Sequence, residues 1–466
     1  MLVDDILLEI FDFCRKIHYD LFFWRSHHDV WNWCILVHVC RRWRQIIFDS
    51  PRRLNLRILC TYGTLVRKNL DIWPAFPINL QFCSPTPRDM TPKDEDNAIA
   101  ALEHRDRISS VELFVAGSEL EKMTAVMQEP FPVLTNLCMH SKDENVLTAT
   151  FLGGSAPHLQ EITLQRIVFP VLPTLLLSTS DLVTLHLLDM PMPGYIPSKR
   201  MAACLAALPR LEAFSISYQD IVSCPRIHPP PVARPILPAL TFFSFQGSFE
   251  YLEDLVARID TPRLDRVSII YLEKPDDFQV TQVSDFIDRS IGPGLSKIAN
   301  VHFQYDRVTF TLSRDYKTYQ GRNRRSISTT ISHEVFDWPR LSDVAWVMGQ
   351  FSAVLCTVVY LELEVEFDHS ADLDRAYDVD WLHLLRQFSS TQTLCVYQEL
   401  AAPVSLSLQD ITEETVTEVL PSLGLICLEG EPASSLEKIV AIRRFSDHPI
   451  TVVETREEFN KKIESY

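Results

Sequence analysis

Apolar and polar positions alternate with a regular spacing along the middle of the chain. From about residue 108 an apolar-x-x-apolar-x-apolar pattern recurs, and the middle apolar positions of its first eight copies lie 26, 25, 23, 29, 29, 24 and 34 residues apart. These middle positions are Val111, Leu137, Ile162, Leu185, Phe214, Phe243, Val267 and Val301. Helix-like stretches such as 199–207 and 250–258 lie between the copies. The pattern predicts repeated units of one strand and one helix, each of which buries its apolar side chains against its neighbours.

The repeat period falls in the range of leucine-rich repeats, which predicts an α/β fold with an irregular βα solenoid over residues 107–430. Two features depart from that repeat. The asparagine that usually follows its leucines is absent, so the turns must be closed in another way, and residues 305–340 alternate as in a β-hairpin. An ordinary α/β domain whose strands resemble the motif is the alternative fold.

Helical periodicity appears near both ends of the chain. Residues 4–16 and 37–48 have the spacing of short amphipathic helices, which predicts a short N-terminal all-α module. Residues 54–60 alternate as a strand, and residues 84–97 are polar and proline-rich, which favours an exposed loop. A helix, a short strand and a charged helix are expected at the C-terminus. The predicted domains are a helical module at 1–50, a connecting strand and loop at 51–106, the repeat array at 107–430 and a C-terminal cap at 431–466.

The net charge of −17 is unevenly distributed. Residues 1–68 carry 11 basic and 7 acidic side chains, whereas the rest of the chain carries 33 and 54. Because an acidic surface repels phosphate backbones, we expect no nucleic-acid partner. The basic first segment is a further indication of a separate N-terminal module.

The cysteines and the longest uncharged run bear on the cellular compartment. The 11 cysteines are spread from Cys14 to Cys427 without a CxxC pair, which is typical of reduced thiols and predicts a cytoplasmic or nuclear protein. Residues 344–361 form an uncharged run of 18 residues, which polar and glycine residues interrupt. We predict a buried helix followed by a strand in this run, and no membrane contact.

Two segments of the N-terminal module resemble the F-box. They are residues 2–11 (LVDDILLEIF) and 36–47 (LVHVCRRWRQII), and the second contains the V-C-R-x-W signature at residues 39–43. The order of an F-box, a strand-rich segment and degenerate leucine repeats is similar to the large F-box-like families of mushroom-forming fungi. One departure is Val3, which stands where the family usually has the proline that sets the entry of the first helix.

The resemblance implies a substrate-receptor subunit of a cullin–RING ubiquitin ligase. The F-box binds a Skp-type adaptor and through it a cullin, and the repeats bind the target protein. The expected adaptor-binding residues are Leu2, Ile6, Ile10, Phe11, Val39 and Trp43. These side chains would divide between the core of the module and the adaptor groove, and Trp43 suits either place because of its large apolar area.

Target binding would fall to the concave face of the array. In a strand with apolar-x-apolar alternation, the intervening side chains point away from the core. The first such set is Glu112, Cys138, Thr163, His186, Ser215, Ser244, Ser268 and His302. The next set is Phe114, His140, Gln165, Leu188, Ser217, Gln246, Ile270 and Gln304. The face is polar without a block of charge, so it predicts a protein-binding surface but does not identify the target.

No motif indicates catalysis. Nucleophile elbows, phosphate-binding loops and metalloprotease motifs are absent from the sequence. His27, His28 and Asp29 are adjacent and cannot readily aim at one ion, and the four aspartates between residues 372 and 380 lack the glycine and glutamate of a calcium loop. We therefore predict a non-enzyme without cofactor or metal. The alternatives are a non-ligase interaction scaffold with a vestigial F-box and, less favoured, an enzyme whose deep pocket would hold perturbed ionisable groups.

Overall fold

The structure is a computed structural model of the chain, and it describes the greater part of the sequence. The described residues are 3–16, 36–51, 53–83, 90–219, 233–271, 281–291, 298–304, 307–313, 326–332, 348–349, 351–366, 380–445, 449–455 and 458–459. The chain divides into two compact units, Met1–Gly194 and Tyr195–Tyr466. They are called the N-terminal unit and the C-terminal unit below.

The N-terminal unit is built on a parallel sheet whose strands follow the order of the chain. The strands are β1 (Ile58–Cys60), β2 (Ile78–Phe82), β3 (Ile108–Val115), β4 (Asn136–Val146), β5 (Glu161–Val168) and β6 (Thr184–Met190). Val111 lies opposite Leu137, Leu137 opposite Ile162, and Ile162 opposite Leu185. The repeat spacing thus predicts the register of these strands, because equivalent apolar positions are direct neighbours. The parallel ladder starts earlier than residue 107, since β1 and β2 belong to it.

The C-terminal unit holds a second series of strands. They are β7 (Ala213–Tyr218), β8 (Phe242–Gly247), β9 (Arg266–Tyr271), β10 (Ile298–Gln304), β11 (Arg307–Ser313), β12 (Ser326–Ser332), β13 (Tyr360–Glu366), β14 (Thr393–Val396), β15 (Leu425–Leu428) and β16 (Thr451–Val453). Their order is β7-β8-β9-β12-β11-β10-β13-β14-β15-β16. The pairs are parallel except β10–β11 and β11–β12, which are antiparallel. The chain is therefore α/β with alternating strand and helix units, as the repeat pattern predicts.

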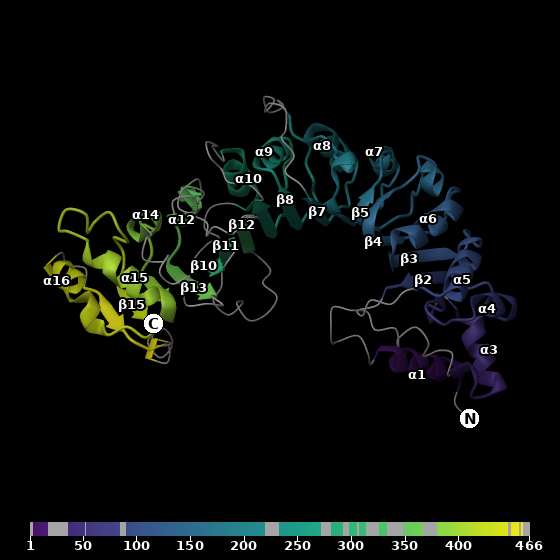
Figure 1. The fold of residues 1–466 in the computed structure, drawn as a ribbon. Helices are drawn as coiled ribbons and strands as arrows, with labels where there is room; N and C mark the ends of the chain where they lie inside the picture. Colours follow the sequence, from purple (N-terminus) through teal and green to yellow (C-terminus); the bar gives the residue numbers. More distant parts are fainter. Residues whose placement is uncertain are drawn as a thin grey trace. The chain divides into compact units, whose positions relative to one another are not determined.

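Helices follow the strands along one side of the sheet in each unit (Figure 1). In the N-terminal unit they are α4 (Val66–Ile72), α5 (Pro92–Leu102), α6 (Gly117–Val126), η2 (Phe151–Gly154), α7 (Leu172–Leu176) and η3 (Met192–Gly194), whereas α1 (Asp4–Lys16) and α3 (Arg41–Asp49) precede the first strand. In the C-terminal unit they are α8 (Ser198–Ala206), α9 (Phe249–Val256), α10 (Thr281–Ile291), α12 (Ser352–Leu355), α14 (Trp381–Leu385), α15 (Gln398–Gln409), η6 (Ala433–Leu436) and α16 (Glu437–Phe445). The apolar alternation of the strands forms the core beneath these helices, where Val111, Leu164 and Phe243 are at most 1% exposed. The other side of each sheet is called the helix-free face.

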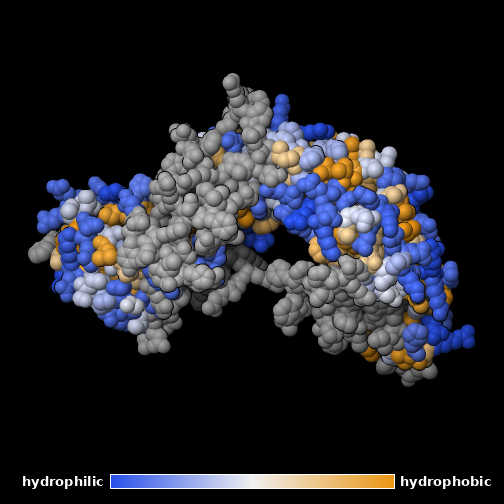
Figure 2. Space-filling model, in the orientation of Figure 1, coloured by the Kyte–Doolittle hydropathy of each residue, from blue (hydrophilic) through white to orange (hydrophobic). Residues whose placement is uncertain are grey.

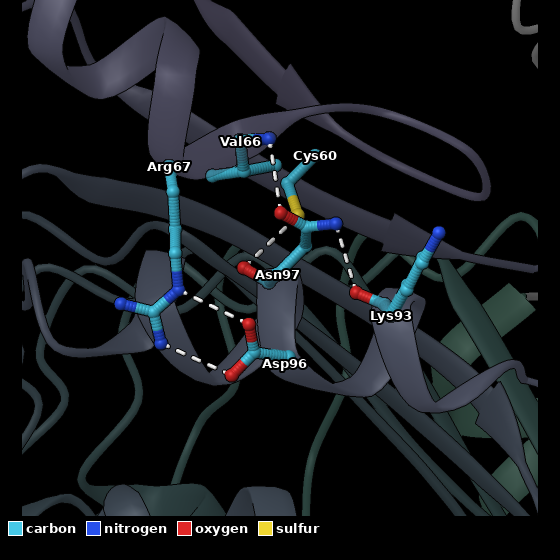
Figure 3. Close-up of polar contacts among 6 residues, drawn as sticks. All are labelled: Cys60, Val66, Arg67, Lys93, Asp96 and Asn97. Atoms are coloured by element: carbon cyan, nitrogen blue, oxygen red, sulfur yellow. Dashed lines mark hydrogen bonds and ion pairs between the residues drawn. The ribbon is translucent and has the colours of Figure 1, made fainter.

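Polar contacts join α4 and α5 to the first strand (Figure 3). The Asn97 side chain accepts a hydrogen bond from the Val66 amide at 3.1 Å and donates one to the Lys93 carbonyl at 2.8 Å. Arg67 donates two bonds of 3.1 Å to Asp96. Because the Val66 amide lies in the first turn of α4 and has no partner within that helix, Asn97 supplies the acceptor that the helix start requires.

The start of α5 corrects the prediction of a loop over 84–97. The helix begins at Pro92, and Thr91 and Asp94 form a capping box in which the Thr91 hydroxyl accepts from the Asp94 amide at 3.2 Å and Asp94 accepts from the Thr91 amide at 3.1 Å. Proline at the first helical position, preceded by threonine, is a helix-start signal that a reading of composition alone overlooks. Residues 84–89 lie outside the described part of the chain.

A hairpin separates two neighbouring repeats. Strands β11 and β12 lie between β9 and β10, so the hairpin-like alternation at 305–340 is confirmed as pairing but occupies an unexpected place in the sheet. Along the backbone register, His302 faces Thr309, Thr309 faces Thr330, and Thr330 faces Ile270. The predicted equivalence of His302 with Ser268 is therefore wrong by two residues. An offset of two keeps each side chain on its expected face.

The run 344–361 ends as predicted in strand β13, after the short helix α12. No helix within the described residues has the length and apolar character to cross a membrane. At the C-terminus α16 and β16 follow each other as expected, and β16 extends the sheet by pairing with β15. Most of the charged helix predicted after β16 lies outside the described residues.

Candidate protein-binding surfaces

Helix α1 presents a row of apolar side chains to solvent. Val3, Ile6 and Ile10 are 60%, 47% and 40% exposed, whereas Leu7 and Phe11 on the neighbouring side of the helix are buried. At 3.6 residues per turn Ile6 and Ile10 lie about 40° apart around α1, and Val3 directly precedes the helix. The three exposed residues are called the α1 stripe. Large apolar side chains that are exposed in a row, not singly, mark a surface suited to a protein partner.

Helix α1 is held against α3 and the turn after it by an aromatic contact and by ion pairs. The rings of Phe11 and Trp43 meet edge to face with centroids 4.9 Å apart. Asp4 accepts a bond of 2.6 Å from Arg42, and Glu9 accepts one from Arg53. These exposed ion pairs each contribute at most about 1 kcal/mol, so the buried Phe11 side chain supplies most of the attachment.

The start of α3 explains part of the cysteine–tryptophan signature. Cys40 precedes the helix in an extended conformation, and its sulfur accepts from the Trp43 amide at 3.4 Å. The helix therefore begins at Arg41, four residues later than the predicted start at residue 37. A thiol in the capping position takes the place that serine or threonine usually fills.

The six residues expected to bind an adaptor differ in their exposure to solvent. Ile6, Ile10 and Val39 are exposed, and Val39 is 56% exposed. Phe11 is buried and Trp43 is partly buried against it, so these two rings serve first to hold the two helices together. Leu2 lies outside the described residues. Val3, which sequence reasoning treated only as a departure from the family, is the most exposed member of the α1 stripe.

The helix-free face of the N-terminal unit carries polar side chains in rows. One row runs Gln81, Glu112, Cys138, Thr163 and His186, and each residue lies opposite the next on adjacent strands. The second row runs Phe114, His140, Gln165 and Leu188. Gln81 is buried and Phe114 is exposed, whereas the other side chains of the two rows are partly exposed. The predicted candidates on this unit therefore do lie together on one face.

A chain of hydrogen bonds connects four side chains of this face. The Cys138 sulfur lies 3.2 Å from His140 Nε2, His140 Nδ1 lies against Gln165 Oε1, and Gln165 Nε2 donates to Asp189 at 2.7 Å. Burial raises the pKa of Cys138 to about 12, so the thiol keeps its proton. Because Gln165 Oε1 can only accept, His140 Nδ1 is the donor in their contact. The chain of hydrogen bonds ends on the Asp189 carboxylate.

The electrostatics of this face disfavour nucleophilic chemistry. Burial and the nearby Glu112 carboxylate raise the pKa of Cys83, as burial does for Cys138, and a protonated thiol is a poor nucleophile. Burial lowers the pKa of His186, whose Nε2 atom is enclosed without a hydrogen-bond partner among the described residues. The face offers neutral donors and acceptors together with the Glu112 and Asp189 carboxylates, which suits recognition of a polar protein surface.

Asp189 and Arg166 belong to the same face but were missed by sequence reasoning. They occupy equivalent positions at the ends of β6 and β5 and both have a left-handed backbone, with φ of 48° and 57°. Their side chains approach to 4.0 Å. Non-glycine residues in this conformation carry strain that surrounding contacts must offset. Strands β5 and β6 therefore turn near their ends without the asparagine of the usual repeat.

The predicted candidates on the C-terminal unit differ in how accessible they are to solvent. Gln246 and Ile270 are partly accessible, whereas Ser217 in the same row is only 7% exposed and is not available as a contact residue. His302 belongs to this row, and Gln304 lies one row further, where its Nε2 donates to Glu366 at 2.8 Å. Alternation predicts the face of each side chain but not whether another segment covers it.

Hydrophilic residues cover most of the described surface in the view of Figure 2, with small apolar areas between them. Within the described residues, no group of three His, Cys, Asp or Glu side chains is placed to hold a metal ion. No protein-family model matches the chain, and no curated protein sequence matches it.

Proposed function

We propose that the chain is a substrate receptor of a cullin–RING ubiquitin ligase. The α1 stripe and Val39 would bind a Skp-type adaptor, and the helix-free faces of an irregular leucine-rich-repeat array would bind the target protein. Ubiquitin transfer would be carried out by partner subunits, so the chain itself would be a binding protein and not an enzyme.

The exposed α1 stripe is the observation that carries this proposal. Ile6 and Ile10 of α1 and the preceding Val3 face solvent, while Phe11 and Trp43 hold the helix in place. Buried residues on one side of α1 and exposed apolar residues on the other support a helix that is fixed by its own module and can bind a partner through the α1 stripe. The V-C-R-x-W segment at residues 39–43 adds the resemblance to the F-box.

Co-purification with a recombinant Skp-type adaptor tests the proposal. The informative variant is Ile6→Asp/Ile10→Asp, because both side chains are exposed and neither carries the contact with α3. Each partly exposed isoleucine should contribute about 1.4 kcal/mol when an adaptor covers it, so the double variant should raise the Kd about 100-fold. Ile72→Asp is the matched control, since Ile72 is 65% exposed but lies at the end of α4.

Equal, background-level recovery of the adaptor by wild type and both variants would refute adaptor binding. The scaffold alternative then applies, in which the chain binds proteins through its helix-free faces alone. Replacement of the usual proline by Val3 favours that alternative, because the entry of the first helix is less restricted.

A further inference from the structure

Two cysteines lie next to each other on neighbouring strands near the end of the C-terminal unit. Cys395 of β14 is the direct register partner of Cys427 of β15, and neither thiol forms a disulfide in the structure. In the row that they share, Glu362 of β13 lies beside Cys395, and Val453 of β16 lies beside Cys427. Within the described strands, no other two cysteines are register partners. Neither adaptor binding nor target binding accounts for this pair.

Backbone hydrogen bonds hold the two strands together on both sides of the pair. Before it, the Leu425 amide donates to the Gln392 carbonyl at 3.0 Å. After it, the Glu429 amide donates to the Val396 carbonyl at 3.0 Å. Because adjacent strands are about 4.8 Å apart, the two cysteine Cα atoms fall in the range of about 4.4–6.8 Å that a disulfide requires. The Cβ atoms of such neighbours are slightly farther apart than in an unstrained disulfide, so closure needs a shift of about a few tenths of an ångström.

Both thiols are buried on the helix-free face. Cys395 is 2% exposed and Cys427 is 0% exposed. They belong to a compact apolar cluster whose other members are Ile298, Tyr360, Leu425, Val453 and Phe459. Burial keeps large oxidants such as glutathione disulfide away from the sulfur atoms, whereas a molecule near the size of water can reach a core thiol through local fluctuations. The oxidant that suits this site is therefore a small peroxide.

Polar contacts fix β14 to the strand on its other side. Glu362 is 3% exposed, and its carboxyl group accepts from the Tyr397 hydroxyl and, at 3.4 Å, from the Asn300 side chain. The Tyr397 amide also donates to the Leu363 carbonyl at 3.1 Å. On the other side of the pair, β15 has only β16 beyond it in the sheet. The small movement that closure needs therefore falls on β15 and Cys427, not on Cys395.

We propose that Cys395 and Cys427 form a redox-responsive thiol pair that closes to a disulfide when the protein meets a peroxide. One sulfur attacks the O–O bond of hydrogen peroxide and becomes a sulfenic acid, and its proton leaves with the displaced hydroxide as water. The second sulfur attacks the sulfenic sulfur, the S–S bond forms, and the second thiol proton leaves with the hydroxyl group as another water. Two thiols are oxidised to one disulfide, and one hydrogen peroxide is reduced to two waters.

The disulfide would join two consecutive repeats covalently. It would enclose residues 396–426, which contain helix α15, in a covalent loop near the end of the array. The thiol pair goes beyond the proposed ligase function and does not depend on adaptor binding, so the two proposals fail independently.

Peptide mapping of the unaltered full chain tests the pair. Trypsin cleaves after Arg386 and after Lys438, and the peptide between these sites contains Cys395 and Cys427 and no other cysteine. The native protein is treated with hydrogen peroxide, then unfolded, alkylated with N-ethylmaleimide and digested. Without peroxide, the peptide should carry two adducts. After peroxide it should carry none and be lighter by two hydrogen atoms, and dithiothreitol given before alkylation should restore both adducts.

Buried cysteines outside the pair are the controls. Cys60 and Cys204 are 0% and 2% exposed, so burial alone does not distinguish them from the pair. The pair should lose its adducts roughly tenfold faster than these thiols or more, because a neighbouring thiol traps the sulfenic acid. Cys395→Ala should keep the Cys427 adduct after peroxide, and Cys204→Ala should behave as wild type. Two adducts on peptide 387–438 after peroxide, or oxygen added to both sulfurs without an S–S bond, would overturn the proposal.

Discussion

The buried carboxyl group of Glu253 makes the stability of the C-terminal unit depend on pH. Glu253 is 1% exposed, and its two oxygens accept from the amides of Gln282 and Val283 at 2.9 and 2.8 Å, at the start of α10. Burial raises its pKa from 4.5 to about 7, the two amide bonds oppose that rise, and the nearby Asp285 adds to it. Tyr271, whose own pKa is raised by burial and by Glu253, faces the same group.

The direction of the pH effect follows from the raised pKa. The folded state holds the Glu253 proton over a range in which the unfolded chain releases it, so the contribution to stability is fully present below about pH 4.5 and is lost as the pH rises through about 7. The difference between the two pKa values corresponds to about 3 kcal/mol. Glu253→Gln keeps an oxygen acceptor for the helix start and removes the ionisation.

Urea denaturation from about pH 4 to about pH 8 measures this contribution. Relative to Glu253→Gln, the wild-type protein should lose about 3 kcal/mol of unfolding free energy over that range. Glu437→Gln, which alters an exposed glutamate of the same unit, should follow the wild type at every pH. Wild-type and Glu253→Gln curves that stay parallel across the range would refute the assigned role of Glu253.

Three further substitutions test local features of the fold by denaturation. Gly153→Ala should cost about 1–3 kcal/mol, because its Cβ would lie 2.6 Å from a proline ring at a φ of +62°, whereas Gly154→Ala has open space and should lose only the smaller backbone term. Asp254→Ala should cost about 3–5 kcal/mol by leaving the buried Arg258 guanidinium without its bidentate partner, and Asp254→Leu/Arg258→Met should lose less. Thr91→Ala should cost about 1 kcal/mol through loss of the capping box, and a loss near zero would show that Asp94 caps the helix alone.

The strands were predictable because their signal is local. Apolar alternation at Val111, Leu137 and Ile162 places these residues opposite each other, since each repeat must match the one beside it. The place of the hairpin was not predictable. Nothing near residue 301 indicates that two later strands separate β10 from β9, because strand order depends on long-range pairing.

The candidate surfaces were predictable to the level of which face a side chain takes. Ile6 and Ile10 belong to the exposed side of α1, and helical spacing is enough to group them. The role of Trp43 required the Phe11 contact. The burial of Cys427 required Phe459, which lies 32 residues later in the chain. Covering of a face by a distant segment leaves no mark in the alternation of the strand itself.

The hairpin β11–β12 has a consequence for how such an array can grow. Each antiparallel step reverses the direction of the chain within the sheet, so two steps restore it, and β10 again runs parallel to β9. An odd number of antiparallel pairings would reverse the polarity of every later strand relative to the earlier ones. It would also bring the helices of the following units to the wrong face, because strand–helix–strand crossovers have a fixed hand. Insertion at this point therefore obeys a parity rule: antiparallel pairings can be added between repeats in even numbers without disturbing the units on either side.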